Sequence, residues 1–350
     1  SPSRGGYAAA IAADETLFSC RQAAAALFDA EAEQVVFTMN ATHGLNIAIS
    51  SLLGPGRRAV ISGFEHNAVT RPLHKLGVRT VVAGRKLFDP EDTLHAFDRA
   101  ITEKTRTVIC THVSNVFGYI LPVEKIAALC RERGVPLILD ASQSAGVLPV
   151  HLRELGAAFI AMPGHKGLYG PQGTGILLCG RMPESLLEGG TGSLSELPQM
   201  PDFLPDLLEA GTVNTPGILG LGAGIGFVLQ HTPARLYRRE MDLCAYLYRG
   251  LSRIDGVKLY SPLPRMGKSL PLIALNLGTL DSTRAAELLN EHHIAVRAGF
   301  HCAALAHRKW HTDRDGVVRV SLGAFNTPAQ AQAFCAAAQE ILRRTRGKKS

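Results

Sequence analysis

Charged and aromatic residues are both scarce in this sequence. Of its 350 residues, 19% are charged and 6% are aromatic, while 46% are hydrophobic. Average soluble domains carry about 25% charged residues. The composition is therefore typical of a large, well-buried globular protein, and it excludes a disordered chain, a collagen and a coiled coil. At roughly 150 residues per domain, the length predicts about two domains.

The seven cysteines include no pair spaced as C-x-x-C. An odd number without that spacing disfavours a secreted disulfide framework and a cysteine-rich zinc module, so we predict a reducing, cytoplasmic location and no metal. Long apolar runs are missing as well. The longest uncharged stretch, 210–234, is interrupted by glycines and prolines, and it predicts no membrane span.

Positive charge is not concentrated in any one part of the chain. The net charge is +7, but the cations are scattered and their only run is the tail 343–349. Solvated chain ends commonly carry such runs, so we predict no nucleic-acid partner. Because the sequence begins with Ser rather than Met, we expect an N-terminal segment to precede it.

Short apolar runs alternate with helical patterns over the first two thirds of the chain. The runs of strand length are 58–62, 79–83, 107–111, 135–140 and 158–162. They lack polar alternation and are separated by helical stretches, so they predict an α/β fold with a mostly parallel sheet covered on both faces. Later strands are shorter. We therefore predict a large domain over 1–231 and a smaller α+β domain over 232–350.

Polar side chains follow several of these runs, where ligands gather in parallel α/β sheets. Asp140 ends a buried run and needs a cationic partner, which a protonated heteroaromatic nitrogen would provide. Lys166, between Gly164 and Gly167, is an amine suited to an aldehyde, and in a pocket it would lose its proton readily. Thr42 at a helix start suits a phosphate.

Three further side chains complete this set. Asn115 and Gln143 are suited to hydrogen-bond a phenolate oxygen, and His66 is suited to stack on a flat ring. Alone, each residue is more often a helix cap, a solvated side chain or part of the core. Together they match a phosphate, a ring oxygen, a ring nitrogen and an aldehyde, which describes pyridoxal 5′-phosphate.

Eight motifs extend this pattern along the chain. They are FTMNAT at 37–42, FEHNA at 64–68, HVSNVFG at 112–118, LDASQ at 139–143, GHKGLYGP at 164–171, EAGTVN at 209–214, RAGFHCA at 297–303 and RVSLGAFN at 319–326. In this order they resemble the class V aminotransferase family of fold type I pyridoxal-phosphate enzymes, and within it the cysteine desulfurases and selenocysteine lyases. The resemblance implies a seven-stranded, mostly parallel sheet in the large domain and a small domain that carries the Cys302 loop.

The resemblance also implies roles for the matched residues. Lys166 would bind the aldehyde of the cofactor and move the Cα proton of the substrate, and Asp140 would pair with the ring nitrogen. The remaining cofactor residues would be His66 on the ring, Asn115 and Gln143 at the 3-oxygen, and Ala41, Thr42 and His165 at the phosphate. Thr212 would reach the phosphate of a neighbouring subunit, which implies a homodimer. The substrate carboxylate would be bound by Arg319, with Asn115 and Arg297 beside it.

One residue departs from the family pattern. Many relatives carry Ser or Thr two positions before the His-Lys pair, and this sequence has Pro163 there. Proline has neither a hydroxyl nor an N–H, so one expected contact with the phosphate is lost.

Cys302 distinguishes among the reactions open to this fold. In the resemblance it is the nucleophilic cysteine, and a thiolate beside a cation such as Arg297 is the reactive form. We therefore predict that the chain removes sulfur from L-cysteine, leaving L-alanine and a persulfide on Cys302 that an acceptor protein could take over. The alternatives are a lyase for L-selenocysteine, a class V aminotransferase or epimerase, and, more remotely, a non-enzymatic metal-binding or sulfur-carrier protein.

Overall fold

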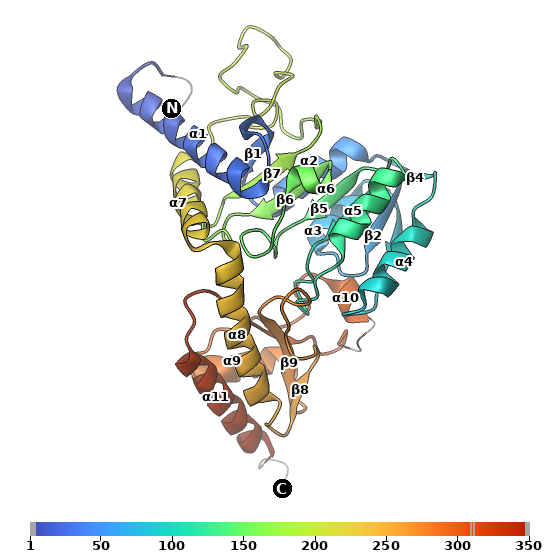
Figure 1. Cartoon of the computed structure of the whole chain (residues 1–350), viewed down its shortest axis with the longest axis vertical. Helices are drawn as coiled ribbons and strands as arrows, with labels where there is room; N and C mark the ends of the chain where they lie inside the picture. The colour runs from blue at the N-terminus through green and yellow to red at the C-terminus, as the bar shows by residue number, and fades with distance from the viewer. Residues whose placement is uncertain (1–4, 309, 311, 347–350) are drawn as a thin grey trace. The chain divides into compact units, whose positions relative to one another are not determined.

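The structure is a computed structural model that describes residues 5–308, 310 and 312–346. Its elements form two compact units, drawn in Figure 1. The first unit comprises 1–84, 90–112 and 122–233, and the second comprises 85–89, 113–121 and 234–350. Two short segments that the sequence analysis assigned to the large domain thus belong to the second unit.

A seven-stranded sheet forms the core of the first unit, in the order β1-β7-β6-β5-β4-β2-β3. The strands are β1 Val35–Thr38, β2 Arg58–Ser62, β3 Arg79–Ala83, β4 Thr105–Thr111, β5 Leu137–Asp140, β6 Phe159–Pro163 and β7 Gly175–Cys179. Strands β3, β2, β4, β5 and β6 pair in parallel, whereas β7 is antiparallel to both β6 and β1. The predicted mostly parallel sheet of seven strands is confirmed.

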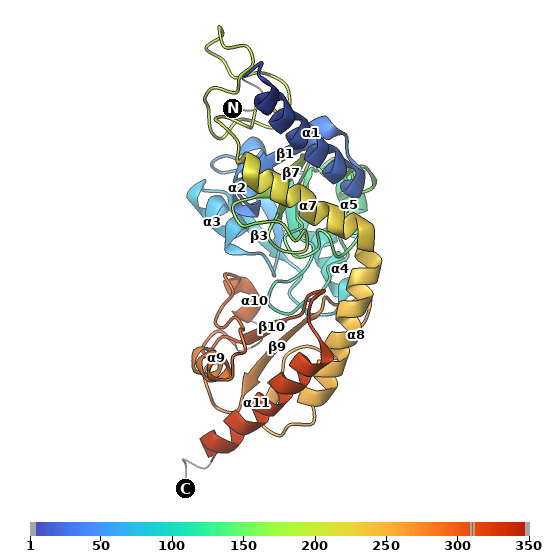
Figure 2. The same cartoon turned by 90° about the vertical axis from the view of Figure 1, so that its left-hand side faces the viewer.

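Helices flank this sheet. They are α1 Ala8–Phe28, α2 Ala41–Leu52, α3 Asn67–Lys75, α4 Pro90–Ala100, α5 Val123–Glu132, α6 Leu152–Leu155 and α7 Thr215–His231, with a 3₁₀ turn at Ala32–Gln34. Helix α2 contacts β5, β6 and β7, and α1 packs along α7 (Figure 2). Helix α5 buries Val123, Ile126, Ala127 and Cys130, whose spacing places them on one face of a helix. Gly134 follows it with a φ of +62°, which favours glycine.

The second unit has its own sheet and core. Its antiparallel strands, in the order β10-β9-β8, are β8 Val257–Leu259, β9 Leu272–Leu277 and β10 Val318–Ser321. Its helices are α8 Pro233–Leu251, α9 Ser282–Glu291, α10 Ala304–Arg308 and α11 Pro328–Arg346. Side chains of α8, α9 and α11 pack with those of the sheet in one buried cluster. Segment 113–121 joins this unit through backbone bonds such as that from Leu270 N to Gly118 O, 2.9 Å long.

None of the helices in the described part of the chain has the length and apolar character that crossing a membrane requires.

Candidate active site

The carboxyl ends of four neighbouring parallel strands bring several predicted residues to one edge of the first unit's sheet. Thr111 at the end of β4 pairs in register with Asp140 at the end of β5, and Asp140 pairs with Ala161 of β6. His66 follows β2, and Lys166 follows β6. The parallel pairing is what gathers residues that lie far apart in sequence, as expected for an α/β sheet.

Asp140 is a buried carboxylate at this edge. Its exposure is 2%, and its Oδ1 accepts a hydrogen bond of 2.9 Å from the amide of Ser142. Among the residues that the structure describes, no cation forms an ion pair with it. A buried charge in that situation is strongly unfavourable until a cation pairs with it. The site therefore requires a positively charged partner at Asp140.

Glu65 is a second buried acid at the same edge, and the sequence analysis gave it no role. Its Oε1 accepts hydrogen bonds from Ser62 Oγ at 2.5 Å and from the Thr111 amide at 2.8 Å, while Oε2 is buried without a partner. Burial raises the pKa of Glu65 to about 8, and nearby Asp140 adds to the rise. The signal for Glu65 was available, because an acid directly after an apolar run is also what singled out Asp140.

His66 and His112 are two histidines that follow strands at this edge of the sheet. His66 is the N-cap of α3, and its Nδ1 accepts a hydrogen bond of 3.0 Å from the amide of Ala68, so a neutral ring carries its proton on Nε2. His112 follows β4, and burial lowers its pKa to about 4. Its Nδ1 is buried without a hydrogen-bond partner. The sequence analysis quoted His112 within a motif but assigned it no role.

The start of α2 presents backbone amides that the helix itself does not satisfy. Asn40 caps it by accepting a hydrogen bond of 3.0 Å from the amide of His43. The amides of Ala41 and Thr42, as the first two of the helix, have no intrahelical partner. The strand behind the terminus lies close, since a Cβ atom at Gly175 would be 2.8 Å from the backbone of Asn40. Glycine is thus required there.

Lys166 lies in a tight loop after β6. Gly164 closes this loop, with its amide bonded to Thr174 O and its carbonyl accepting from Gly170 N, both at 2.8 Å. A Cβ atom at Gly164 would meet Thr174 Oγ1 at 2.1 Å. Lys166 and His165 are exposed in the single chain, so the expectation of a buried lysine is wrong for the chain by itself. Pro163 is the last residue of β6, and it supplies neither a hydroxyl nor an N–H.

The second unit holds the other predicted residues. Cys302 is half-buried, with a φ of +56°, and Arg297 Nη2 lies 3.6 Å from its Sγ. Asn115 Nδ2 donates to the carbonyl of His301 at 2.7 Å, and Asn115 O accepts from Arg319 Nη1 at 2.9 Å. Asn115, predicted to act beside the cofactor ring, is thus bonded to the Cys302 turn.

Arg319 has a hydrogen-bond donor available for a ligand. Its Nε is buried without a hydrogen-bond partner, and its backbone pairs with that of Arg297. Burial lowers the pKa of Arg319 to about 10, and the neighbouring charge of Arg297 contributes. A guanidinium that is partly desolvated and close to a second cation favours an anionic ligand.

The predicted residues therefore form two groups. The first unit holds Ala41, Thr42, His66, Asp140, Gln143, His165, Lys166 and Thr212. The second unit holds Asn115, Arg297, Cys302 and Arg319. Gln143 is half-buried in the turn after β5, near the end of the strand that carries Asp140.

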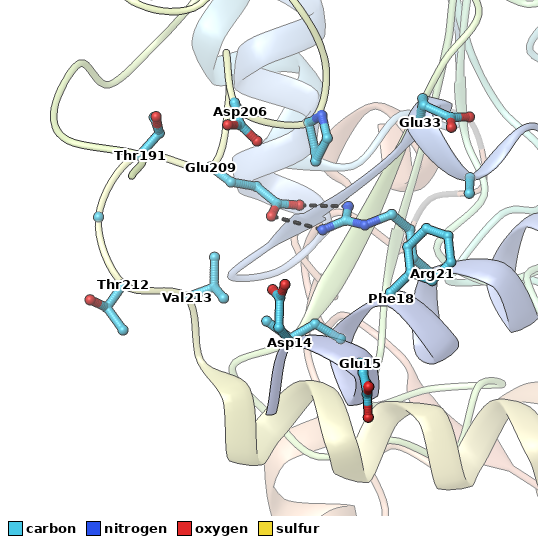
Figure 3. Close-up of a pocket in the computed structure, with 14 residues that line it drawn as sticks. Asp14, Glu15, Phe18, Arg21, Glu33, Thr191, Asp206, Glu209, Thr212 and Val213 are labelled. Carbon is cyan, nitrogen blue, oxygen red and sulfur yellow. Dashed lines mark hydrogen bonds and ion pairs between the residues drawn. The ribbon is translucent and has the colours of Figure 1, made fainter. Parts of the chain in front are cut away.

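Thr212 lies apart from the sheet edge, at a cavity of about 430 Å³ shown in Figure 3. The cavity lies over the ion pair between Arg21 and Glu209, whose two nitrogen–oxygen contacts measure 2.8 and 2.9 Å. Its other charged lining side chains are Asp14, Glu15, Glu33 and Asp206. Such a lining repels phosphate, so the cavity is not a phosphate site within one chain.

His301 and His307, two histidines near Cys302, form hydrogen bonds within the chain. His301 Nε2 is 3.0 Å from Val317 O, and His307 is bonded through both ring nitrogens. Within the described residues, no group of three or more His, Cys, Asp or Glu side chains is arranged to hold a metal ion. His311, which is also close to Cys302 in the sequence, lies outside those residues.

The fold and the strand-end residues define a class of protein. A mostly parallel seven-stranded sheet, with a buried aspartate and a lysine after adjacent strands, has the architecture of the fold type I pyridoxal-phosphate enzymes. The family described as aminotransferase class-V matches residues 1–334. The chain belongs to that family, as its motifs predicted.

Curated relatives and solved structures agree on a narrower group. A probable cysteine desulfurase of Methanothermobacter thermautotrophicus is 32% identical, over 97% of this chain and 86% of the relative. A cysteine desulfurase of Escherichia coli O139:H28 is 33% identical, with the same coverage of each chain. A cysteine desulfurase structure from Thermococcus onnurineus is 28% identical, has a TM-score of 0.87 and covers 97% of this chain and 87% of that one.

Proposed function

We propose that the chain is a pyridoxal-phosphate-dependent cysteine desulfurase that converts L-cysteine to L-alanine and keeps the sulfur as a persulfide on Cys302. The observation that carries this proposal is the turn at Cys302. A non-glycine residue with a φ of +56° is held by its surroundings, and the guanidinium of Arg297 lies 3.6 Å from Sγ, where it would stabilise negative charge on the reacting sulfur. Backbone strain of this kind is typical of functional sites.

The residues of the first unit fit the cofactor. Asp140 is a buried carboxylate that lacks a cationic partner among the described residues, and a protonated pyridine nitrogen would be that partner. Lys166 offers an amine to the aldehyde. The first amides of α2, at Ala41 and Thr42, suit the phosphate, and the imidazole of His66 suits the ring face.

Two other residues would complete the cofactor site. Gln143 offers an amide donor to the ring oxygen, and His165 adjoins the phosphate side of the lysine loop. Desolvation, and then the positive charge of Lys166, lower the pKa of His165. Since Pro163 gives no hydroxyl, the α2 amides carry a larger share of phosphate binding here.

The reaction then follows from the roles of the side chains. When bound, pyridoxal phosphate supplies an electron-withdrawing ring that acidifies the Cα of the substrate and labilises its Cβ–sulfur bond. Lys166 Nζ removes the proton at Cα and returns it to the product. Cys302 Sγ attacks the sulfur of the substrate, the sulfur–Cβ bond breaks, and Cβ gains a proton to become the methyl group of alanine. One thiol and one cysteine thus give one persulfide and one alanine.

Arg319 would bind the carboxylate of the substrate. Its Nε is buried and unpartnered, while Nη1 is already bonded to Asn115 O. A carboxylate supplies the acceptor that this guanidinium lacks. Arg297 is closer to Cys302 and would stabilise the thiolate before transfer and the persulfide after it.

We further propose that the chain acts as a homodimer in a reducing, cytoplasmic setting and passes its sulfur to an acceptor protein. Thr212 is exposed, and within one chain it lies at an acidic cavity rather than among the cofactor residues. Large apolar side chains are also exposed on α1 and α7, including Ile11, Phe18, Leu219 and Leu229. Light scattering of the purified protein tests whether it is a homodimer. A monomer that retains full activity would exclude the homodimer as the active form.

The central test compares Cys302→Ala with Cys335→Ala. Both cysteines are half-buried, so Cys335 is a matched control. We expect Cys302→Ala to abolish sulfide release and alanine formation from L-cysteine while cofactor absorbance stays unchanged, and Cys335→Ala to behave as wild type. Full sulfide release by Cys302→Ala would overturn the role of Cys302 as the nucleophile. Rates with L-selenocysteine, measured alongside, separate desulfurase from lyase activity.

A further inference from the structure

The turn that carries Cys302 adopts an unfavourable backbone conformation at two successive residues. His301 has a φ of +50° and Cys302 a φ of +56°, and both values lie in the left-handed region that favours glycine. Such residues keep this conformation only where surrounding contacts determine it. The contacts that hold this turn therefore also orient the Cys302 thiol.

The base of the turn is closed by backbone bonds. Gly299 and Val317 exchange two hydrogen bonds, each 3.1 Å long, and Ala303 N donates to Phe300 O at 3.0 Å. Glycine is required beside this pair, because a Cβ atom at Gly316 would lie 2.7 Å from the backbone of Gly299. These bonds close the loop. Phe300 O can accept a second hydrogen bond, and His301 O is left to a donor from elsewhere.

Side chains hold the tip. Asn115 Nδ2 donates to His301 O at 2.7 Å, and His307 Nε2 is 3.1 Å from Phe300 O. His307 is on α10, the short helix that directly follows the turn, and its exposure is 0%. Its other nitrogen, Nδ1, is 2.8 Å from the hydroxyl of Thr312.

These contacts select one form of the His307 ring. A carbonyl oxygen only accepts, so the bond to Phe300 O requires the proton on Nε2. Nδ1 of the neutral ring then accepts, and the Thr312 hydroxyl is its donor. Because burial lowers the pKa of His307, the ring is neutral at physiological pH and this tautomer persists.

We propose that His307 is a positioning residue for the sulfur-transfer step, which holds the Cys302 turn in its left-handed conformation through the bond from Nε2–H to Phe300 O, with Thr312 fixing the tautomer. This inference rests on the proposed function, because it takes the step at Cys302 to be sulfur transfer. The geometry itself lies entirely within the second unit. His307 acts on Cys302 through the backbone and does not touch substrate.

Two substitutions of His307 test the contacts of its two ring nitrogens separately. His307→Gln places an amide nitrogen near the position of Nε2 and retains the donor to Phe300 O. His307→Asn places its amide near Nδ1, so it retains the contact with Thr312 and loses the one with Phe300. A role in general packing predicts that the smaller Asn and the more flexible Gln harm the enzyme to a similar degree.

The first readout is the rate at which iodoacetamide modifies Cys302, followed by mass spectrometry of the peptide. We expect His307→Asn to slow it about tenfold and His307→Gln to stay within about twofold of wild type. The second readout is steady-state kinetics with L-cysteine, where His307→Asn should lower kcat by a similar factor with KM and cofactor absorbance unchanged. Equal rates for both variants, or a KM effect alone, would overturn the proposal.

Thr312→Val is the supporting variant if His307→Asn does not fold. It removes the hydroxyl that donates to Nδ1 and preserves side-chain shape, so it should slow alkylation in the same direction by a smaller factor. Alkylation needs neither cofactor nor turnover. A wild-type protein without desulfurase activity would therefore refute the proposed function, while the order of alkylation rates would still decide the role of His307.

Discussion

Thr111 donates its amide hydrogen to the carboxyl group of Glu65 across a distance of 2.8 Å. This bond ties the turn after β2, which presents His66, to the end of β4. Ser62 Oγ bonds to the same oxygen, so one buried side chain organises both strand ends. An acid used in this way is most stable when it carries a proton, because its second oxygen has no partner.

The first prediction concerns the pH dependence of stability. With its pKa raised to about 8, Glu65 keeps its proton in the folded chain across a range in which the unfolded chain, with a value of 4.5, has lost it. The folded state then binds more protons, so stability falls as pH rises from about 4.5 to about 8. Glu65→Gln removes this term, and its Tm should exceed that of wild type by roughly 5 °C more at pH 8 than at pH 5.

Calorimetry of the cofactor-free protein at both pH values is the measurement. Glu124→Gln, at an exposed site on α5, is the control and should follow wild type at both pH values. Parallel pH profiles for wild type and Glu65→Gln would contradict the prediction.

The second prediction concerns the charge of Asp140. Asp140→Asn keeps an oxygen that accepts from the Ser142 amide, so the turn after β5 should persist. The negative charge that would hold a protonated ring nitrogen is lost. We expect turnover of L-cysteine to fall by at least about 100-fold, or about 2.7 kcal/mol of transition-state stabilisation, with Tm of the cofactor-free protein not reduced. Retention of more than a tenth of the activity would show that this carboxylate is not the electronic partner.

The third prediction concerns Arg297 and the reactivity of Cys302. With Nη2 3.6 Å from Sγ, the positive charge of the guanidinium would stabilise negative charge on the sulfur as it reacts. Arg297→Gln should therefore slow iodoacetamide modification of Cys302 about fivefold at pH 7, and high salt should narrow the difference. Arg284→Gln, which removes an exposed cation from α9, serves as the control. Equal rates of Cys302 modification in wild type and both variants would show that Arg297 does not increase the reactivity of Cys302.

The fourth prediction separates binding from chemistry at Arg319. Arg319→Lys retains a positive charge but loses the planar guanidinium and its buried Nε donor. We expect KM for L-cysteine to rise at least about tenfold, with a smaller change in kcat. Analogues of cysteine without the carboxylate should bind Arg319→Lys and wild type equally well. If such analogues still bound wild type more tightly, Arg319 would not be the carboxylate site.

The fifth prediction concerns the ion pair in Figure 3. Arg21 is 7% exposed and also contacts Val35 O and the ring of Phe37. Arg21→Met leaves the Glu209 carboxylate buried and unpaired, so it should lower the free energy of unfolding by about 3–5 kcal/mol. Adding Glu209→Gln should recover part of this loss, because glutamine still accepts from the Phe37 amide. Urea denaturation measures both effects, and additive losses would contradict the pairing.

The sheet could be predicted from the sequence because its parallel strands are continuous apolar runs. Runs such as 58–62 and 79–83 coincide with β2 and β3. Strand β7 was missed, since its residues Gly175–Cys179 follow a glycine-rich loop without a preceding helix. The two short segments at 85–89 and 113–121 were also missed, because membership of a compact unit depends on distant contacts such as that between Phe88 and Tyr119.

The candidate site was predicted unevenly. Asp140 and Lys166 could be found because Asp140 ends β5 and Lys166 lies in the loop after β6, where position alone suggests chemistry. Glu65 and His307 were passed over, because their importance lies in burial and in hydrogen bonds to residues such as Thr111 and Phe300. Asn115 was correctly placed after a strand, yet its amide bonds to the carbonyl of His301, 186 residues further along the chain.

By itself, the sequence determined the architecture, the family and the set of reactive groups, because hydrophobic periodicity and residue chemistry are local properties. Only the tertiary structure decided the state of those groups. Burial raises the pKa of Glu65, and Asn115 and His307 bond to the carbonyls of the Cys302 turn. Protonation and strain depend on the surroundings of a residue, and folding alone supplies those surroundings.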